Sequence, residues 1–240
     1  MECWAATLGD CAGGRSREHY ISDAIFDDQA VTVFGLDWCK QHPKEIGLAN
    51  AVANILCRHH NGALSLFDAE AAKLSRFLSS NLSHDPLADA QLSLSGPLLE
   101  RWAVKTYVNL GYLGGLDPET HRRMNPAAHL VEYLFQDAVP RAAIGLYHIR
   151  GAVSNDDFAV GLSWNGIRNQ SRNGSIGGMT FTLNGVRFVV SGDPELSDQQ
   201  ITRLGVVHGV DYASQKVVFR PANITFKSRT AGTKTIQLKW

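Results

Sequence analysis

The sequence predicts an α+β protein, because apolar residues recur with a helical period in the middle of the chain and with a period of two toward its C-terminus. A third observation is a concentration of cysteine and histidine within the first seventy positions. We expect a zinc-stapled module over residues 1–72, a helical segment over 73–142 and a β-rich region over 143–240. The change of period near 140–143 is either a domain boundary or a change of layer within one domain.

Three helices are expected in the middle of the chain. The first covers 68–78, where apolar residues have helical spacing. Pro97 opens the second and Gly111 ends it, since proline suits the first turn of a helix and glycine follows the last. The third covers 126–136.

Six strands are expected after residue 142. They cover Ala143–Ile149, Phe158–Trp164, Met179–Leu183, Val186–Ser191, Lys216–Phe219 and Thr233–Leu238. Asn184-Gly185 has the composition of a tight turn, which predicts a hairpin between two of these strands. The glycine-rich stretch 174–178 is expected to form a loop.

Length and composition are those of a globular protein that can bury a core. The chain has 240 residues, of which 44% are hydrophobic and 19% charged. No apolar run reaches the roughly 18 residues of a membrane span, and no secretory signal pattern is seen. We therefore expect a cytoplasmic protein without a membrane partner, whose four cysteines are reduced and serve as ligands or free thiols.

The charge balance argues against a dedicated DNA-binding protein. The chain has 23 basic and 23 acidic residues, which gives a net charge of zero. Residues 212–240 nevertheless contain lysines and arginines and no acidic residue. This basic stretch either meets phosphates or is a solvated strand face.

The spacing of cysteine and histidine predicts a zinc site. Cys57-x-x-His60 allows one turn to present two ligands to a single ion. Cys3 and Cys11 supply the other two, and the glycines nearby permit a loop of the required length.

Two alternatives within this ligand set stay open. Cys39 could replace Cys11, although we prefer it as a buried free thiol beside Trp38. His59 competes with His60, and we favour His60 because it leaves two residues between the ligands, the spacing typical of zinc sites.

A second set of residues has the chemistry of phosphodiester hydrolysis. A neutral histidine can accept a proton from water near pH 7, and carboxylate and amide oxygens suit Mg²⁺. Glu18, His19 and Asn61 supply these groups. Adjacent strand residues point to opposite faces, so Glu18 and His19 can face one metal only if the strand twists or turns there.

Asn61 is expected to cap a helix, and Asp68 would follow two turns later on the same face. Asp68 is then a further metal ligand, a group that orients one, or only a cap or surface carboxylate.

Residues 1–72 resemble the HNH (ββα-metal) endonucleases with a treble-clef zinc site. In that family an acid-histidine pair on the first strand is followed by a hairpin and a helix headed by asparagine, and two ligand pairs for zinc bracket the unit. The matching residues are Glu18-His19 for the acid-histidine pair, Asn61 for the asparagine, and Cys3, Cys11, Cys57 and His60 for the zinc set. The sequence departs from the family in using Glu18 rather than the commoner aspartate, in using His60 as the fourth zinc ligand, and in its longer stretch from His19 to Asn61.

The resemblance implies a metal-dependent endonuclease that hydrolyses DNA phosphodiester bonds. His19 would be the general base, Glu18, Asn61 and Asp68 would serve a catalytic Mg²⁺ or Mn²⁺, and Zn²⁺ would be structural. The implied partner is nucleic acid, with DNA as the first expectation, and a homodimer would place two modules on opposite strands. Two alternatives are a non-catalytic zinc-binding module that contacts nucleic acid or protein, and an RNA-directed nuclease or effector.

Overall fold

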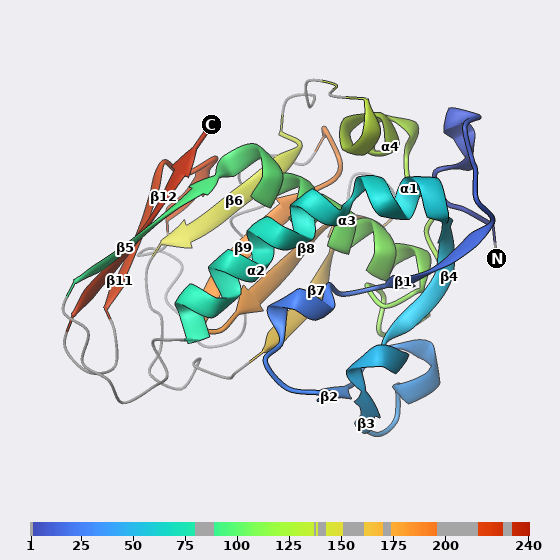
Figure 1. Cartoon of the computed structure of the whole chain (residues 1–240), viewed down its shortest axis with the longest axis horizontal. Coiled ribbons are helices and arrows are strands. Elements are labelled where there is room, and N and C mark those ends of the chain that lie inside the picture. Colours follow the sequence, from blue (N-terminus) through green and yellow to red (C-terminus); the bar gives the residue numbers. More distant parts are fainter. Residues whose placement is uncertain are drawn as a thin grey trace.

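The computed structural model describes residues 2–79, 89–136, 138, 143–150, 161–169, 174–195, 216–227 and 232–240. These residues form a mixed α+β structure, which confirms the predicted class (Figure 1). The helices are α1 (Arg58–Ala63), α2 (Ser65–Ser79), α3 (Gly96–Tyr112) and α4 (Ala128–Phe135). Short 3-10 helices are η1 (Ala6–Leu8), η2 (Asp23–Ile25), η3 (Asp37–Cys39) and η4 (Leu48–Asn50). No helix in this part of the chain is long and apolar enough to cross a membrane.

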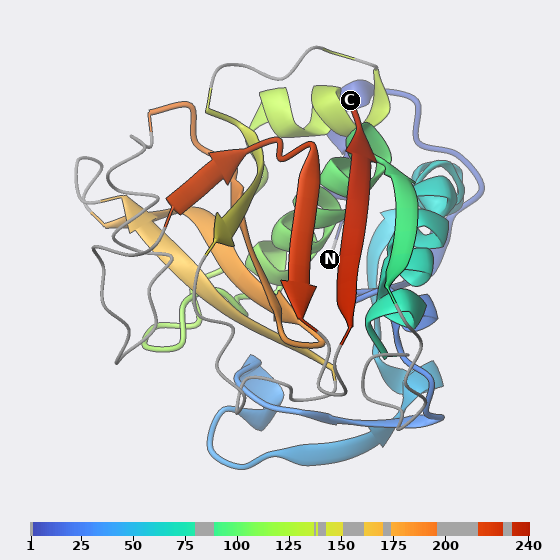
Figure 2. The same ribbon diagram turned by 90° about the vertical axis from the view of Figure 1, so that its left-hand side faces the viewer.

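The largest sheet has five antiparallel strands in the order β10-β6-β9-β8-β7 (Figures 1 and 2). Its strands are β6 (Gly145–Arg150), β7 (Leu162–Asn169), β8 (Ser175–Leu183), β9 (Val186–Ser191) and β10 (Lys216–Phe219). A second sheet has the order β11-β12-β5, built from β5 (Ala90–Ser95), β11 (Asn223–Lys227) and β12 (Thr233–Lys239). Two further antiparallel pairs join β1 (Arg15–His19) to β4 (Val52–Cys57) and β2 (Ala30–Val33) to β3 (Lys44–Gly47).

The predicted helices form where their sequence signals lie. Ser95 caps α3 by accepting a hydrogen bond from the backbone N–H of Leu98, and Pro97 occupies the first turn. The third expected helix is α4, which is shorter than 126–136. The hairpin turn is also confirmed, because Asn184 and Gly185 have φ values of 44° and 86°, as a tight turn between twisted strands requires.

Several strand predictions were wrong or incomplete. The stretch 174–178 is not a loop, since β8 begins at Ser175. At Gly178 a Cβ atom would lie 2.6 Å from the carbonyl oxygen of Val190, so glycine serves close strand packing here. Strands β5 and β11 were not predicted. Of the expected strand Phe158–Trp164, residues 158–160 lie outside the described residues, and β7 continues to Asn169.

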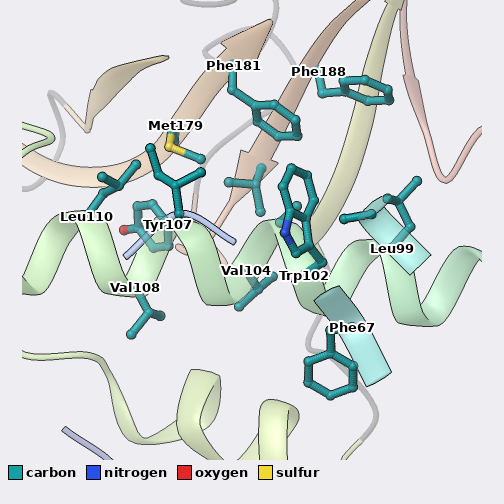
Figure 3. Packing of buried hydrophobic residues seen from close by; sticks show 14 of the residues in the cluster. Phe67, Leu99, Trp102, Val104, Tyr107, Val108, Leu110, Met179, Phe181 and Phe188 are labelled. Atoms are coloured by element: carbon teal, nitrogen blue, oxygen red, sulfur yellow. The ribbon is translucent and has the colours of Figure 1, made fainter. Parts of the chain in front are cut away.

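Helix α3 lies between α2 and the five-stranded sheet, and contacts both (Figure 1). Trp102 on α3 packs edge-on against Phe181 at a centroid distance of 5.7 Å, and Phe181 stacks on Phe188 at 5.2 Å (Figure 3). The same hydrophobic cluster includes Trp4 near the N-terminus and Ile236 in β12. Residues on both sides of position 142 therefore share one core.

Strand β12 is the central strand of the smaller sheet and pairs in parallel with β5, from Lys234 opposite Ala90 to Lys239 opposite Ser95. At the start of α3, a Cβ atom on Gly96 would lie 2.5 Å from the ring of Trp240. The first residue of α3 therefore has no room for a side chain.

Candidate metal centre and a buried lysine

The first turn of α1 places two of the predicted zinc ligands together. Cys57 is the N-cap residue of α1, and its sulfur accepts a hydrogen bond from the backbone N–H of His60 at 3.4 Å. The loop with Cys3 and Cys11 is joined to β4 and α1 by backbone hydrogen bonds. These run from Trp4 N to Ile55 O (3.0 Å), from Arg58 N to Gly14 O (2.9 Å) and from His59 N to Ala12 O (3.3 Å).

Four ligand atoms converge at this point. The Nδ1 atom of His60 lies 3.4 Å from the sulfur of Cys3, 3.7 Å from that of Cys11 and 3.2 Å from that of Cys57. All four atoms lie within 4.8 Å of one another. A tetrahedral zinc ion with ordinary bond lengths separates its ligand atoms by roughly 3.5–3.8 Å, so this set has the size and chemistry to hold Zn²⁺.

The two alternative ligands lie elsewhere. Cys39 is buried in the hydrophobic core and belongs to no metal-ligand cluster in the described part of the chain. The Nε2 atom of His59 lies 3.4 Å from Asp10, and these two exposed residues form with His60 a second, smaller group of possible metal ligands.

Asp10, which no sequence pattern marked as a site residue, supports the fourth ligand. Its Oδ1 atom lies 2.8 Å from Nε2 of His60, whose side chain is 1% exposed. A carboxylate on the far nitrogen of a metal-bound histidine fixes the ring and its tautomer. Burial raises the pKa of Asp10, but the hydrogen bond and charge of His60 outweigh it, so that the pKa lies below its usual value. Its position next to Cys11 was the only signal in the sequence.

The pKa values of the Cys11 and Cys57 thiols are shifted in opposite directions. Burial and the neighbouring thiols of Cys3 and Cys57 raise the pKa of Cys11 to about 12. Burial also disfavours the thiolate of Cys57, but hydrogen bonds from the backbone of His60 and Ala12 lower its pKa overall. Three crowded sulfurs repel one another as thiolates, so a cation among them would favour the charged forms.

Glu18 lies in a different and drier environment. Its Oε1 atom is 2.8 Å from Nζ of Lys105 and accepts a hydrogen bond from Nδ2 of Asn109 at 3.2 Å. Both residues of the ion pair are buried, with Glu18 at 3% and Lys105 at 2% exposed. Burial raises the pKa of Glu18, and the Lys105 charge acts against this shift.

Asp68 binds the same ammonium. Nζ of Lys105 donates to both carboxylate oxygens of Asp68 at 2.8 Å, and the hydroxyl of Ser22 donates to Asp68 as well. The indole N–H of Trp102 in turn donates to the Ser22 oxygen at 2.9 Å. Asp68 therefore belongs to a buried network that connects α2 and α3.

The lysine occupies the position that a divalent cation would need. A metal ion held by Glu18 and Asp68 would have to displace the Lys105 ammonium from a buried site. Within the described residues, neither acid belongs to a cluster of metal ligands. The residues present do not fit a Mg²⁺ or Mn²⁺ centre on these two carboxylates.

Asn61 does not start a helix. It lies inside α1, whose N-cap is Cys57, and its Nδ2 atom donates to the hydroxyl of Ser16 at 2.7 Å. The expectation of a cap at Asn61 was wrong because the Cys57 sulfur takes that role. A turn at Leu64 separates α1 from α2, so Asn61 and Asp68 are not on one continuous helix.

His19 lies on the other face of β1 from Glu18. Burial alternates along this strand, with Ser16 and Glu18 facing the helices and Arg15, Arg17 and His19 more exposed. Nδ1 of His19 is 3.8 Å from a carboxylate oxygen of Asp23. The structure therefore does not bring Glu18, His19 and Asp68 into one metal-ligand cluster.

No protein-family model matches this chain, and neither the curated proteins nor the solved structures give a match.

We expect the protein to bind one zinc ion per chain through Cys3, Cys11, Cys57 and His60. Cys57→Ser should abolish stoichiometric binding because it removes a ligand and the α1 cap, and Asp10→Asn should weaken binding about 10- to 100-fold. Zinc content by mass spectrometry and competition with a chromogenic chelator would measure both effects. Cys39→Ser is the matched control and should retain one zinc; loss of zinc in that variant would contradict the assignment.

Lys105→Met should destabilise the protein by about 3–5 kcal/mol, because it leaves two carboxylates without their buried partner. The free energy of unfolding in urea would measure this loss. A triple variant that adds Glu18→Gln and Asp68→Asn should recover part of it, since the unpaired charges are then gone. A triple variant less stable than Lys105→Met alone would show that the charges are not the cause.

Proposed function

We propose that this chain is a zinc-stabilised nucleic-acid-binding protein whose contact surface is the exposed face of β1. The observation that supports this proposal is the alternation along β1, which exposes Arg15 and Arg17 on one face, with the half-buried His19 beside them. We call these three residues the arginine face. Ser16 and Glu18 on the opposite face of β1 point toward the helices, so a shift of the strand by one residue would expose Glu18.

The zinc site would hold this face in place. The ligand loop runs directly into β1, and Gly14 accepts the hydrogen bond that positions Arg58. A Cβ atom at Gly13 would lie 3.0 Å from the Arg58 side chain, so the loop packs closely on this exposed arginine. Arg58 adds a positive charge at this end of the β1–β4 pair, since it directly follows Cys57, the residue opposite Arg15.

Exposed guanidinium groups are suited to phosphates, because their planar donors match phosphate oxygens in pairs. Arg17 keeps its position by donating to the carbonyl oxygen of Ala49 at 3.1 Å. The net charge of zero means that attraction to a polyanion would be local to this face and would not come from the whole protein.

The double variant Arg15→Ala/Arg17→Ala should weaken binding to nucleic acid and reduce its salt dependence. Each phosphate contact contributes about 0.7–0.9 to the slope of log affinity against log salt, so the slope should fall by about 1.4–1.8. Fluorescence anisotropy with single-stranded and duplex DNA and RNA oligonucleotides, at several salt concentrations, would measure both quantities.

The matched control is Arg122→Ala/Arg123→Ala, which removes the same charge from exposed positions before α4. If both double variants bind equally, the arginine face is not the contact surface. If wild-type protein with zinc binds none of the four nucleic acids, the proposed function fails.

Hydrolysis of the bound nucleic acid is a second candidate function, supported by His19. This histidine lies on the arginine face, and its Nδ1 atom is near the Asp23 carboxylate. Its Nε2 atom is buried and has no hydrogen-bond partner among the described residues. An acid beside one ring nitrogen and an unpaired second nitrogen is a pattern found in general bases. For His19 to act in this way, its ring would have to turn so that Nε2 meets water.

We expect no cleavage of supercoiled plasmid with added Mg²⁺ or Mn²⁺, because the two buried acids already hold Lys105. Gel analysis of wild type beside His19→Ala is the measurement, with RNA as the second substrate. Cleavage that requires metal and falls at least about 10²-fold in His19→Ala would contradict this expectation and establish the second candidate.

A further inference from the structure

A groove of about 620 Å³ lies between β2 and β7, away from the zinc ligands. Ala30–Val33 of β2 line one side, and Leu162–Asn165 line the other. The hairpin of β2 and β3 lies beyond the end of the main sheet, next to β7 (Figure 1). Tyr20 and Ile25 line the buried side of the groove. Its volume is within the range of pockets that bind small organic molecules.

Most side chains that line the groove are apolar, and its charged lining residues are all acidic. Aromatic side chains of Phe26, Phe34 and Trp164 line the groove together with aliphatic residues. Its only charged lining residues in the described part of the chain are Asp27 and Asp28, which are both exposed. The groove would therefore repel phosphates, so it is not an extension of the arginine face.

Tyr20 gives an independent sign of a ligand. Its side chain is 4% exposed, and its hydroxyl has no hydrogen-bond partner among the described residues. Burial raises its pKa to about 12, so the hydroxyl is neutral near pH 7 and can both donate and accept. An unpaired buried hydroxyl costs stability, and a ligand atom that pairs with it would remove this cost.

We propose that this groove binds an organic cation, a molecule with an apolar body of aromatic size and a protonated amine. The body would pack against Phe26 and Trp164, and the amine would lie beside Asp27 and Asp28. A polar atom on the body would pair with the Tyr20 hydroxyl once this buried side chain turns toward the groove. This site is separate from the zinc centre and does not depend on binding of nucleic acid.

The test uses dansylcadaverine, which joins an apolar fluorophore to a primary amine, and its N-acetylated form, which keeps the body and lacks the charge. Titration of the full chain at low salt is followed by dansyl fluorescence and anisotropy. We expect the amine to bind about 10-fold more tightly than the acetylated probe, since two carboxylates each contribute a modest attraction.

Asp27→Asn/Asp28→Asn should abolish this preference and leave binding of the acetylated probe unchanged. Glu132→Gln, an exposed acid on α4, is the control and should keep the preference. Equal affinity for the two probes, no binding of the amine, or a preference that survives the double variant would each overturn the proposal.

Tyr20→Phe separates a ligand contact from a packing role. It should weaken probe binding roughly 2- to 10-fold, the usual effect of one lost hydrogen bond. The midpoint of thermal unfolding should not fall, because the variant removes an unpaired buried hydroxyl. A lower midpoint with unchanged probe affinity would show that Tyr20 serves the fold alone.

Discussion

The ammonium group of Lys105 lies where β1, α2 and α3 meet. It binds Glu18 from the first strand and Asp68 from the second helix, while Asn109, one turn further along α3, bonds both Glu18 and the indole N–H of Trp4. A charge in so dry a place is tolerated only when its partners surround it closely. The relative position of these three elements is therefore set to within hydrogen-bond distances, and this fixes which face of β1 is left for solvent.

In the N-terminal segment, the proposed zinc ion would bind the sulfur and imidazole groups, while Lys105 binds the carboxylates. Sulfur and imidazole suit zinc, and the set of Cys3, Cys11, Cys57 and His60 is built from them. Carboxylates suit hard metal cations, but here the ammonium group of Lys105 binds the carboxylate instead. The acid of the Glu18-His19 pair therefore serves internal packing.

The pairing of Cys57 with His60 could be predicted from the sequence because less than one helical turn separates them, so local geometry brings them together. Cys3 and Cys11 join them across a separation of 57 and 49 residues, which no local rule predicts. Helix α3 was predictable for a similar reason, since Pro97 is a local signal. The partners of Glu18 were not predictable, because Lys105 and Asn109 lie far along the chain and nothing local joins them to β1. Strand β5 was missed because its partner, β12, begins more than 130 residues later.

The parallel pairing of β5 with β12 has a consequence for how the chain reaches its folded state. Strand β5 precedes α3, so the helix at the centre of the core is synthesised long before the strand that closes the sheet beside it. Contacts between distant parts of a sequence slow folding, and an unpaired strand edge invites association with other chains. During translation the edge of β5 is without its partner until β12 leaves the ribosome, and this interval is when the nascent protein is most exposed to aggregation.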